Sequence, residues 1–202
     1  VASPSDTSDE RRQVELAIEQ VNTQIANRDS IQFEYIGWDK TVVPEIGMTP
    51  QSVIDEQVSG HDIFIGILRT RFGVPTDGFG SGTEKEFDNA IAQSKSTSNF
   101  YKLHAYFYNG SINLSEVDVG QFAKVKTFKE SMNDRGVLYK NYVDMESLRQ
   151  FLVLNLTKDA TDYLSSSAVS SKADGFAEVK KTNPDVDQAS CADEEVELGW
   201  LD

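Results

Sequence analysis

The sequence predicts an α/β domain with a doubly wound, five-stranded parallel sheet and helices on both faces. Strand-like and helix-like patterns alternate along residues 1–164, and such alternation builds parallel sheets through right-handed crossovers. The run Asp62–Leu68 is apolar on both sides, as in a strand that helices cover on both faces. The chain has 202 residues, of which 39% are hydrophobic and 26% charged, as in a globular domain.

The first half of the chain is predicted to begin with the end of a strand at Val1–Ala2. Apolar residues at helical spacing then predict a helix over 9–26, with Thr7 and Ser8 as capping residues. Residues 31–38 alternate between apolar and polar, as a half-buried strand does. Thr49 and Pro50 open a short helix over 50–58, and the buried strand 62–68 follows.

The second half is predicted to continue the alternation. A helix over 82–94 follows a Gly-rich loop, with Thr83 as its cap. Strands are expected over 103–108 and 137–143, and helices over 121–134 and 145–164. In such a sheet, ligands bind beyond the carboxyl ends of the strands, so the loops at that edge are the place to expect chemistry.

Charge and cysteine content exclude several classes of function. The chain carries 33 acidic and 19 basic residues, a net charge of -14, which disfavours nucleic acid and anionic membranes as partners. No apolar run approaches the roughly 20 residues that span a bilayer. One Cys, Cys191, and two His predict no internal disulfide and no metal site. We expect a cytoplasmic protein.

The C-terminal part of the chain differs from the rest. Residues 165–174 are rich in Ser, Ala and Asp, which predicts a linker or a frayed helix. Residues 183–202 hold seven acidic residues and no basic one, which predicts an acidic tail. We therefore expect one α/β domain over residues 1–164 and a linker with an acidic tail over 165–202. Because the chain opens without Met, we expect it to be part of a longer protein.

Two loops at the expected carboxyl edge carry candidate ligand-binding residues. Ser3, Ser5 and Asp6 lie where a strand runs into a helix N-terminus, where hydroxyl and N–H groups can hold a phosphate or simply cap the helix. Arg69 and Arg71 stand at the root of a long loop with Gly and Pro. These arginines could grip an anionic ligand or form surface ion pairs.

Two glutamates in the first turn of the 82–94 helix are candidate catalytic residues. Acidic side chains there complement the helix dipole and need no other role. Alternatively, Glu84 or Glu86 could stabilise or attack the anomeric carbon of an N-glycoside. Trp38 follows a strand and could stack on a base, or form part of the core.

Four strings together resemble a bacterial TIR-like domain family of unassigned function. They are Ala2–Asp6, Asp62–Gly66, Arg71-Phe72-Gly73 and Ser81-Gly-Thr-Glu-Lys-Glu-Phe87. This family is grouped with TIR domains and nucleoside 2-deoxyribosyltransferases, and its members usually precede STAND-type signalling ATPases or helical repeats. The resemblance covers roughly residues 1–160 and implies a flavodoxin-like fold.

The resemblance also implies a site. In the transferases a Ser-Gly-Thr-x-x-Glu string supplies the nucleophile, which falls on Glu86, and Phe72, Gly73, Ser81 and Thr83 would lie around the ligand. The transferases' acidic residue before this string falls on Gly80, and the Trp of many TIR enzymes falls on Gly82. The implied function is an effector module of a signalling or antiphage defence protein that cleaves NAD or a related nucleotide.

Two other functions stay open at this point. The chain could be a non-catalytic module that self-associates and recruits partners, or a domain that binds a nucleotide signal without cleaving it. The expected partners are a nucleotide, downstream domains of the same protein and further copies of the chain. No cofactor is expected, because NAD would serve as substrate.

Overall fold

The computed structural model describes residues 1–25, 31–37, 60–76, 78–97, 99–113, 115 and 117–179. Contacts divide the chain into two compact units, Val1–Tyr163 and Leu164–Asp202. The sheet and the helices that cover it belong to the first unit. Trp38, the predicted helix over 50–58 and the acidic tail with Cys191 lie outside the described residues.

Among the described residues, three parallel strands form a sheet in the order β1-β2-β3. β1 is Ile63–Leu68, β2 is Lys102–Tyr108 and β3 is Tyr139–Tyr142. Phe64 aligns with Leu103, and Tyr106 with Lys140. All residues of β1 after Ile63 are buried, as its apolar run predicts. The parallel arrangement and these three strands confirm the prediction within one or two residues at each end.

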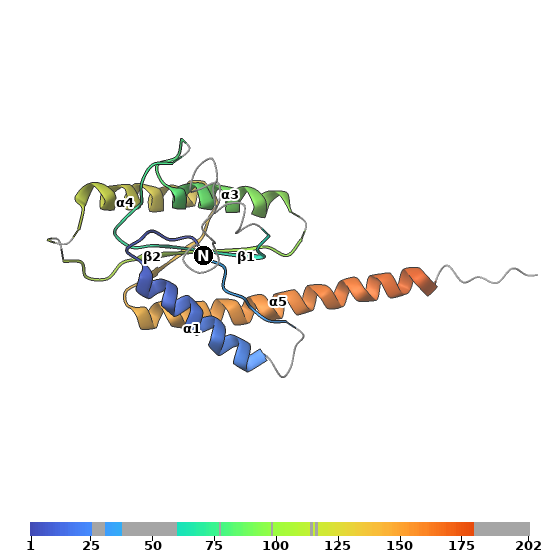
Figure 1. Cartoon of the computed structure of the whole chain (residues 1–202). Coiled ribbons are helices and arrows are strands. Elements are labelled where there is room, and N and C mark those ends of the chain that lie inside the picture. The colour runs from blue at the N-terminus through green and yellow to red at the C-terminus, as the bar shows by residue number, and fades with distance from the viewer. Residues whose placement is uncertain are drawn as a thin grey trace, which may run out of the picture. The chain divides into compact units, whose positions relative to one another are not determined.

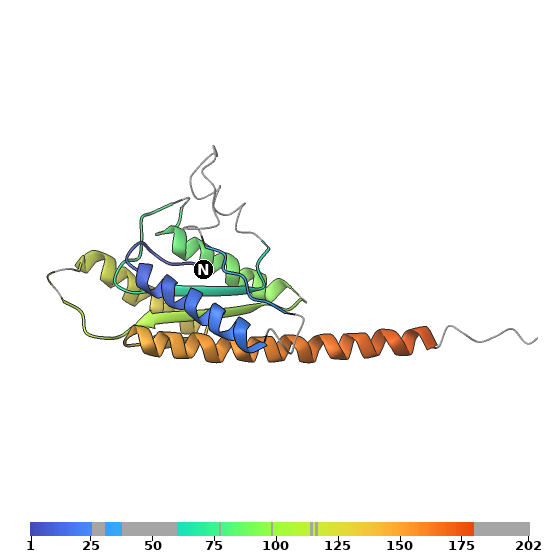
Figure 2. The same cartoon turned by 60° about the horizontal axis from the view of Figure 1, so that its bottom comes forward.

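Four helices of the described part of the chain pack around the sheet. They are α1 (Ser8–Ile25), α3 (Gly82–Ser96), α4 (Val119–Asp134) and α5 (Met145–Val179). Figure 1 shows α3 and α4 on one side of the strands, and α1 with the first part of α5 on the other. The turned view in Figure 2 keeps α1 and this part of α5 together on one face. The expected layers, with helices on both faces of a parallel sheet, are therefore present.

The alternation of side chains along β1 separates two hydrophobic cores, because successive residues of a strand point to opposite faces. Phe64 and Leu68 pack with α3 and α4. Ile65 and Ile67 pack with α1 and α5. The α3/α4 core is rich in Phe, and the α1/α5 core is mostly aliphatic, with Val14, Leu148 and Leu152 fully buried.

The predicted five-stranded sheet is not shown, because two of the expected strands are incomplete. Near the N-terminus only Ala2 pairs with β1, through two hydrogen bonds of 2.9 Å to Ile65 and Ile67. The pairing stops there because Pro4, two residues on, has no N–H and bends the chain into the turn before α1. Ala2 lies beside β1, on the side opposite β2.

Residues 31–37 run beside Val1 without forming a strand. The Val1 nitrogen donates to the Ile36 carbonyl at 2.6 Å. The side-chain amide of Asn22 binds both backbone groups of Phe33, each at 2.8 Å. A side chain of α1 thus takes the backbone groups that a neighbouring strand would otherwise pair.

The last helix is longer than the sequence predicts. α5 begins at Met145, as expected, and continues to Val179, through the segment where the sequence predicts a linker or a frayed helix. Ser147 and Asp144 exchange hydrogen bonds at its start. Its buried residues Leu148, Leu152, Leu156 and Ala160 follow helical spacing and face the sheet.

Candidate functional site

The start of α3 carries both candidate catalytic glutamates, but they have different surroundings. Ser81 is the N-cap, and its hydroxyl accepts from the Glu84 N–H at 3.0 Å. The Glu84 carboxylate reaches back to the Gly80 N–H at 2.7 Å. Ser81 and Glu84 thus satisfy backbone donors at the helix end, close to the capping-box arrangement. The prediction that Thr83 caps the helix was wrong: Thr83 lies inside the helix and is buried.

Glu84→Ala therefore tests a structural role. We expect the free energy of unfolding to fall by about 1 kcal/mol, because the variant loses the acceptor for Gly80 and a favourable charge in the first turn. Chemical denaturation measures the change. Lys85→Ala, in the same turn, serves as the comparison for loss of side-chain bulk. An unchanged denaturation midpoint in Glu84→Ala would contradict the capping role.

The Ser3–Thr7 loop is held by a buried guanidinium. Arg11 of α1 donates to Ser3 Oγ at 3.1 Å, to the Pro4 carbonyl at 3.1 Å and to Thr7 Oγ1 at 3.3 Å. Ser3, Thr7 and Arg11 are all buried, whereas Ser5 is exposed. The Ser3 hydroxyl, expected at a phosphate, is thus turned towards a residue of the same chain.

Asp6 connects this loop to the loop that follows β1. Its Oδ2 accepts from the N–H groups of Thr70 and Arg71 at 3.0 Å each, and from Thr70 Oγ1 at 2.8 Å. Arg71 itself is exposed. Asp6 therefore anchors this loop. Of Asp6 and Arg71, both predicted to bind a ligand, Arg71 is the one with an exposed side chain.

Arg69 packs against aromatic and acidic groups at the carboxyl end of the sheet. Its guanidinium lies 3.5 Å from Glu10 Oε1 and 4.8 Å from the centre of the Tyr108 ring. Glu10 is fully buried and accepts from the Tyr142 hydroxyl at 3.0 Å. Arg69 therefore faces a buried carboxyl group of its own chain.

The predicted residues Phe72 and Gly73 belong to the α3/α4 side of the domain. Gln121 Oε1 of α4 accepts from both of their N–H groups at 2.9 Å. The Phe72 ring is buried and packs edge-on against Phe128, with ring centres 5.3 Å apart. Phe72 is a core residue, and its backbone ties the loop to α4.

Glu86 lines a cavity of about 720 Å³, the larger of two described cavities. Asn89 and Gln93 line it from the same face of α3, since they follow Glu86 by one and two helical turns. Residues 31–36 and 60–65 form further walls, and Asp159 and Tyr163 of α5 contribute another. A volume of this size lies in the range of sites for small organic ligands.

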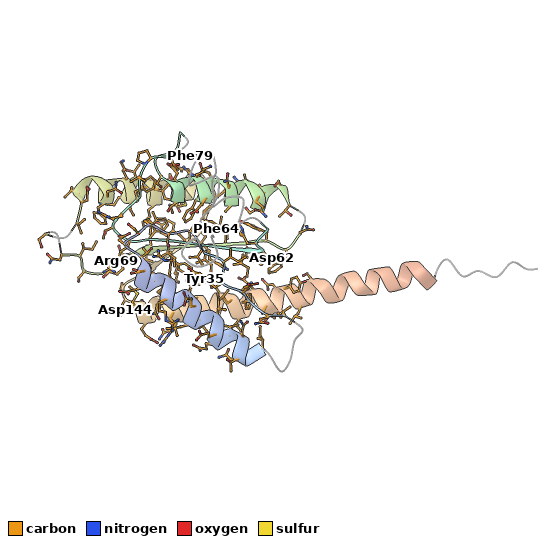
Figure 3. All side chains as sticks on the ribbon, viewed as in Figure 1. Tyr35, Asp62, Phe64, Arg69, Phe79 and Asp144 are labelled. Carbon is orange, nitrogen blue, oxygen red and sulfur yellow. The ribbon has the colours of Figure 1, made fainter. Side chains whose placement is uncertain are left out.

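The structure thus separates the predicted site residues into two places. The cavity contains Glu86 and lies beside the amino half of β1, whereas Arg69 follows the carboxyl end of that strand. Figure 3 labels Asp62, a wall residue of the cavity, and Arg69 well apart. None of the other predicted residues in the described part of the chain lines the cavity. The physical reason is that α3 runs back along the sheet and carries Glu86 away from the carboxyl edge.

Sequence reasoning missed several residues around the cavity. His61 lines it and hydrogen-bonds to the Tyr101 hydroxyl at 3.0 Å. Burial raises the pKa of Tyr101 to about 12, so its hydroxyl stays protonated. Asp159 also lines the cavity and contacts His104 Nε2 at 2.6 Å. In the sequence, Asp159 could have been noticed only as an acidic residue next to Ala160, which lies on the apolar face of the helix.

The described part of the chain has neither a metal-binding cluster nor a membrane-spanning helix. No set of three or more His, Cys, Asp or Glu side chains there is placed to hold a metal ion. Among the helices that the structure describes, none is long and apolar enough to cross a membrane.

Comparison with known proteins gives a family. The model of the family described as Domain of unknown function (DUF4062) matches residues 1–156, which include the whole sheet and the cavity residues up to Leu156. No curated protein and no solved structure is significantly similar to the chain. Since the match covers more than half of the sequence, the chain belongs to the DUF4062 family.

Proposed function

We propose that the chain is a TIR-like effector module that hydrolyses the N-glycosidic bond of NAD or a related nucleotide, with Glu86 as the catalytic carboxylate. The observation that carries this proposal is the position of Glu86 on the wall of the 720 Å³ cavity. Glu84, the other candidate, does not line it and binds the Gly80 N–H instead. The module would act within a bacterial signalling or antiphage defence protein, whose further domains would cluster it.

The charge of the cavity suits this reaction. Glu34, Asp62, Glu86 and Asp159 all line it. When a nicotinamide–ribose bond breaks, the electron pair of the bond moves to the ring nitrogen and positive charge grows on the ribosyl carbon. Carboxylates around that carbon stabilise the transition state more than the ground state. Glu86 would either stabilise the cation or bond to it, and water would then release the sugar.

The remaining walls offer contacts for a nucleoside. Phe33, Tyr35, Phe100 and Tyr163 provide aromatic surface on which a base can stack. The side-chain amides of Asn89 and Gln93 can bind ribose hydroxyls or the carboxamide of nicotinamide. Because the described lining is acidic, we expect the phosphates of a nucleotide to extend away from Glu86.

The test is release of free nicotinamide, measured by chromatography. The chain is incubated at high concentration and after artificial clustering, with NAD and, separately, with nicotinamide riboside. We expect release by the parent protein and a loss of about a hundredfold or more in Glu86→Gln, which keeps the shape of the side chain but not its charge.

Glu19→Gln is the matched control, because Glu19 is an exposed glutamate of α1 and does not line the cavity. It should cleave at the parental rate. Equal release by the parent and Glu86→Gln would remove Glu86 from the site. No release from either substrate, even after clustering, would reject the hydrolase proposal for these substrates.

One observation favours the non-catalytic alternative. Among the described strands, β3 is at the edge of the sheet, and the residues that flank it expose apolar side chains: Leu138 is 92% and Val143 53% exposed. An open strand edge with apolar neighbours is a surface on which a protein can associate. The interaction module becomes the better-supported function if clustering fails to activate cleavage and Leu138→Glu abolishes self-association of the chain in solution.

A further inference from the structure

Glu10, in the first turn of α1, has a carboxyl oxygen without a hydrogen-bond partner. Glu10 is 0% exposed. Its Oε1 accepts from the Tyr142 hydroxyl at 3.0 Å and lies 3.5 Å from Arg69. Its Oε2 is buried and has no hydrogen-bond partner. A buried acceptor of this kind is costly, and a carboxylate oxygen even more so than a neutral one.

A second such oxygen belongs to Asp6, four residues earlier. Asp6 Oδ2 binds the Thr70 and Arg71 backbone and the Thr70 hydroxyl. Its Oδ1 is buried and has no partner. These two atoms are the buried side-chain oxygens or nitrogens that lack a partner in the described part of the chain. Asp6 lies just before α1 and Glu10 in its first turn, and the charge of Asp6 acts on Glu10.

One proton satisfies both oxygens. A proton on Glu10 Oε2 turns this atom into a hydrogen-bond donor. Asp6 Oδ1 is the buried acceptor that lacks a donor, so it is the atom that can accept this proton's hydrogen bond. We propose that Glu10 is a neutral carboxylic acid in the folded protein and donates this proton to the Asp6 carboxylate, so that the pair locks the start of α1 to the loop after β1. The pair then carries one negative charge, which Arg69 faces.

The surroundings of Glu10 agree with a neutral acid. Burial raises the pKa of Glu10, and the charge of Asp6 acts in the same direction, against hydrogen bonds from backbone and Tyr142 and the charge of Arg69. Tyr142 is itself kept protonated, since burial and the nearby Glu10 raise its pKa. The groups that face Glu10 are thus Asp6 before α1, Arg69 after β1 and Tyr142 of β3.

The lock has a defined consequence for the fold. While Glu10 keeps its proton, the Asp6 carboxylate stays in place and holds residues 70 and 71. When Glu10 ionises, its charge and that of Asp6 repel each other at the start of α1. The repulsion favours states in which Asp6 releases this loop, which leads along the chain to α3. The switch does not depend on the proposed hydrolysis, and its tests measure no activity.

The sign of the pH effect follows from linkage. A group whose pKa is higher in the folded than in the unfolded state stabilises most at low pH, and this stability is lost as pH rises through the folded-state pKa. Between the ordinary pKa of Glu and the raised value, the folding equilibrium constant should fall by about tenfold per pH unit for this one proton. Denaturation of the parent over a series of pH values above 4.5, the ordinary pKa of Glu, measures this slope.

Two amide variants separate the shared proton from burial alone. Glu10→Gln places an N–H₂ donor where Oε2 is, keeps the acceptor for Tyr142 and should remove the slope. Asp6→Asn keeps an acceptor for Thr70 and Arg71 and offers its own donor to Glu10 Oε2, so Glu10 no longer needs the proton and the slope should again vanish. If burial alone holds the proton, Asp6→Asn keeps the parental slope.

Infrared spectroscopy tests the proton directly. At a pH just above 4.5, the ordinary pKa of Glu, the parent should show the carbonyl stretch of a buried protonated carboxyl group, and Glu10→Gln should lack it. Glu19→Gln, the exposed glutamate on the same helix, should retain both band and slope. Absence of the band from the parent, or equal slopes in the parent and Glu10→Gln, would overturn the proposal. If Glu10→Gln folds poorly, the comparison of Asp6→Asn with the parent still decides.

Discussion

Gly66→Ala should destabilise the protein by about 3 kcal/mol, at the upper end of what an added methyl group costs in a packed core. Gly66 lies in β1, between Ala2 on one side and Ala105 of β2 on the other. A Cβ at this position would overlap the ring of Phe87, whose Cζ, Cε2 and Cε1 atoms are its nearest neighbours. The expected result is a fall of roughly 6–12 °C in Tm.

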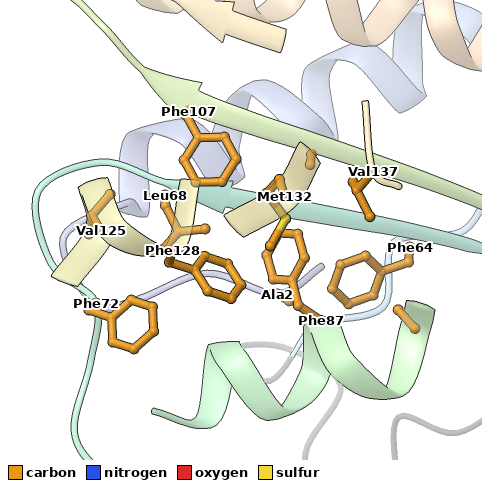
Figure 4. Close-up of a cluster of buried hydrophobic side chains, with 12 residues drawn as sticks. Ala2, Phe64, Leu68, Phe72, Phe87, Phe107, Val125, Phe128, Met132 and Val137 are labelled. Carbon is orange, nitrogen blue, oxygen red and sulfur yellow. The ribbon is translucent and has the colours of Figure 1, made fainter. Parts of the chain in front are cut away.

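The clash has no inexpensive relief, because Phe87 is held on all sides. Its ring is 0% exposed and packs edge-on against Phe64 and Phe128, with ring centres 5.0 and 5.3 Å away. Figure 4 shows Phe87 of α3 pointing into the cluster between Phe64 and Phe128. Moving the ring therefore means moving α3 or β1, and α3 carries Glu86.

Two further variants make this prediction specific. Phe87→Leu in the Gly66→Ala background should recover part of the loss, so the two substitutions should be non-additive. Gly120→Ala is the control for the change from Gly to Ala, since a Cβ there meets only Asp118 Oδ1 at 3.3 Å; it should stay within about 1 kcal/mol of the parent. Full additivity of Gly66→Ala and Phe87→Leu would refute the steric explanation.

Arg11→Met should cost about 2–4 kcal/mol, because it removes the buried donor to the Ser3 and Thr7 hydroxyl oxygens. The guanidinium bridges Ser3 Oγ, the Pro4 carbonyl and Thr7 Oγ1, and Met keeps much of the side-chain length without any hydrogen-bond donor. The loop it holds connects the Ala2 pairing with α1, so hydrogen exchange at Ala2 and Ile67 should also rise.

Arg12→Met is the matched control for this substitution. Arg12 is the next residue, but its side chain is 57% exposed and its ion pair with Glu15 lies on the surface. Such a pair contributes about 0–1 kcal/mol, so the control should denature almost as the parent does. Equal losses in both variants would mean that the charge of α1, and not the buried hydrogen bonds, sets the stability.

Much of the architecture could be predicted from local pattern. Successive side chains of Ile63–Leu68 pack into the two cores in turn. Because this run is apolar on both faces, it identifies a central strand of a parallel sheet. Helical spacing identifies α1, α3, α4 and the start of α5, because burial of one face repeats with the helical period. These features depend on residues that are close in sequence.

The failed strand predictions have tertiary causes. The alternation in residues 31–37 is typical of a strand, yet the Asn22 side chain occupies the backbone of Phe33. The alternation of apolar and polar residues indicates which side chains are buried. It does not indicate which groups hydrogen-bond to the backbone. The cap of α3 failed for a smaller reason: Ser81 and Thr83 are both good caps, and the loop geometry selects Ser81.

By itself the sequence determined the class of fold, the parallel strands and the choice of Glu86 as a candidate. Only the tertiary structure decided which residues share a site, because those distances depend on how α3 runs back along the sheet. It placed Glu86 with Asp62 and Asp159 in a cavity, and turned Arg69 towards Glu10. It also revealed the two buried oxygens of Asp6 and Glu10, since burial and missing partners are properties of packing and cannot be read from spacing.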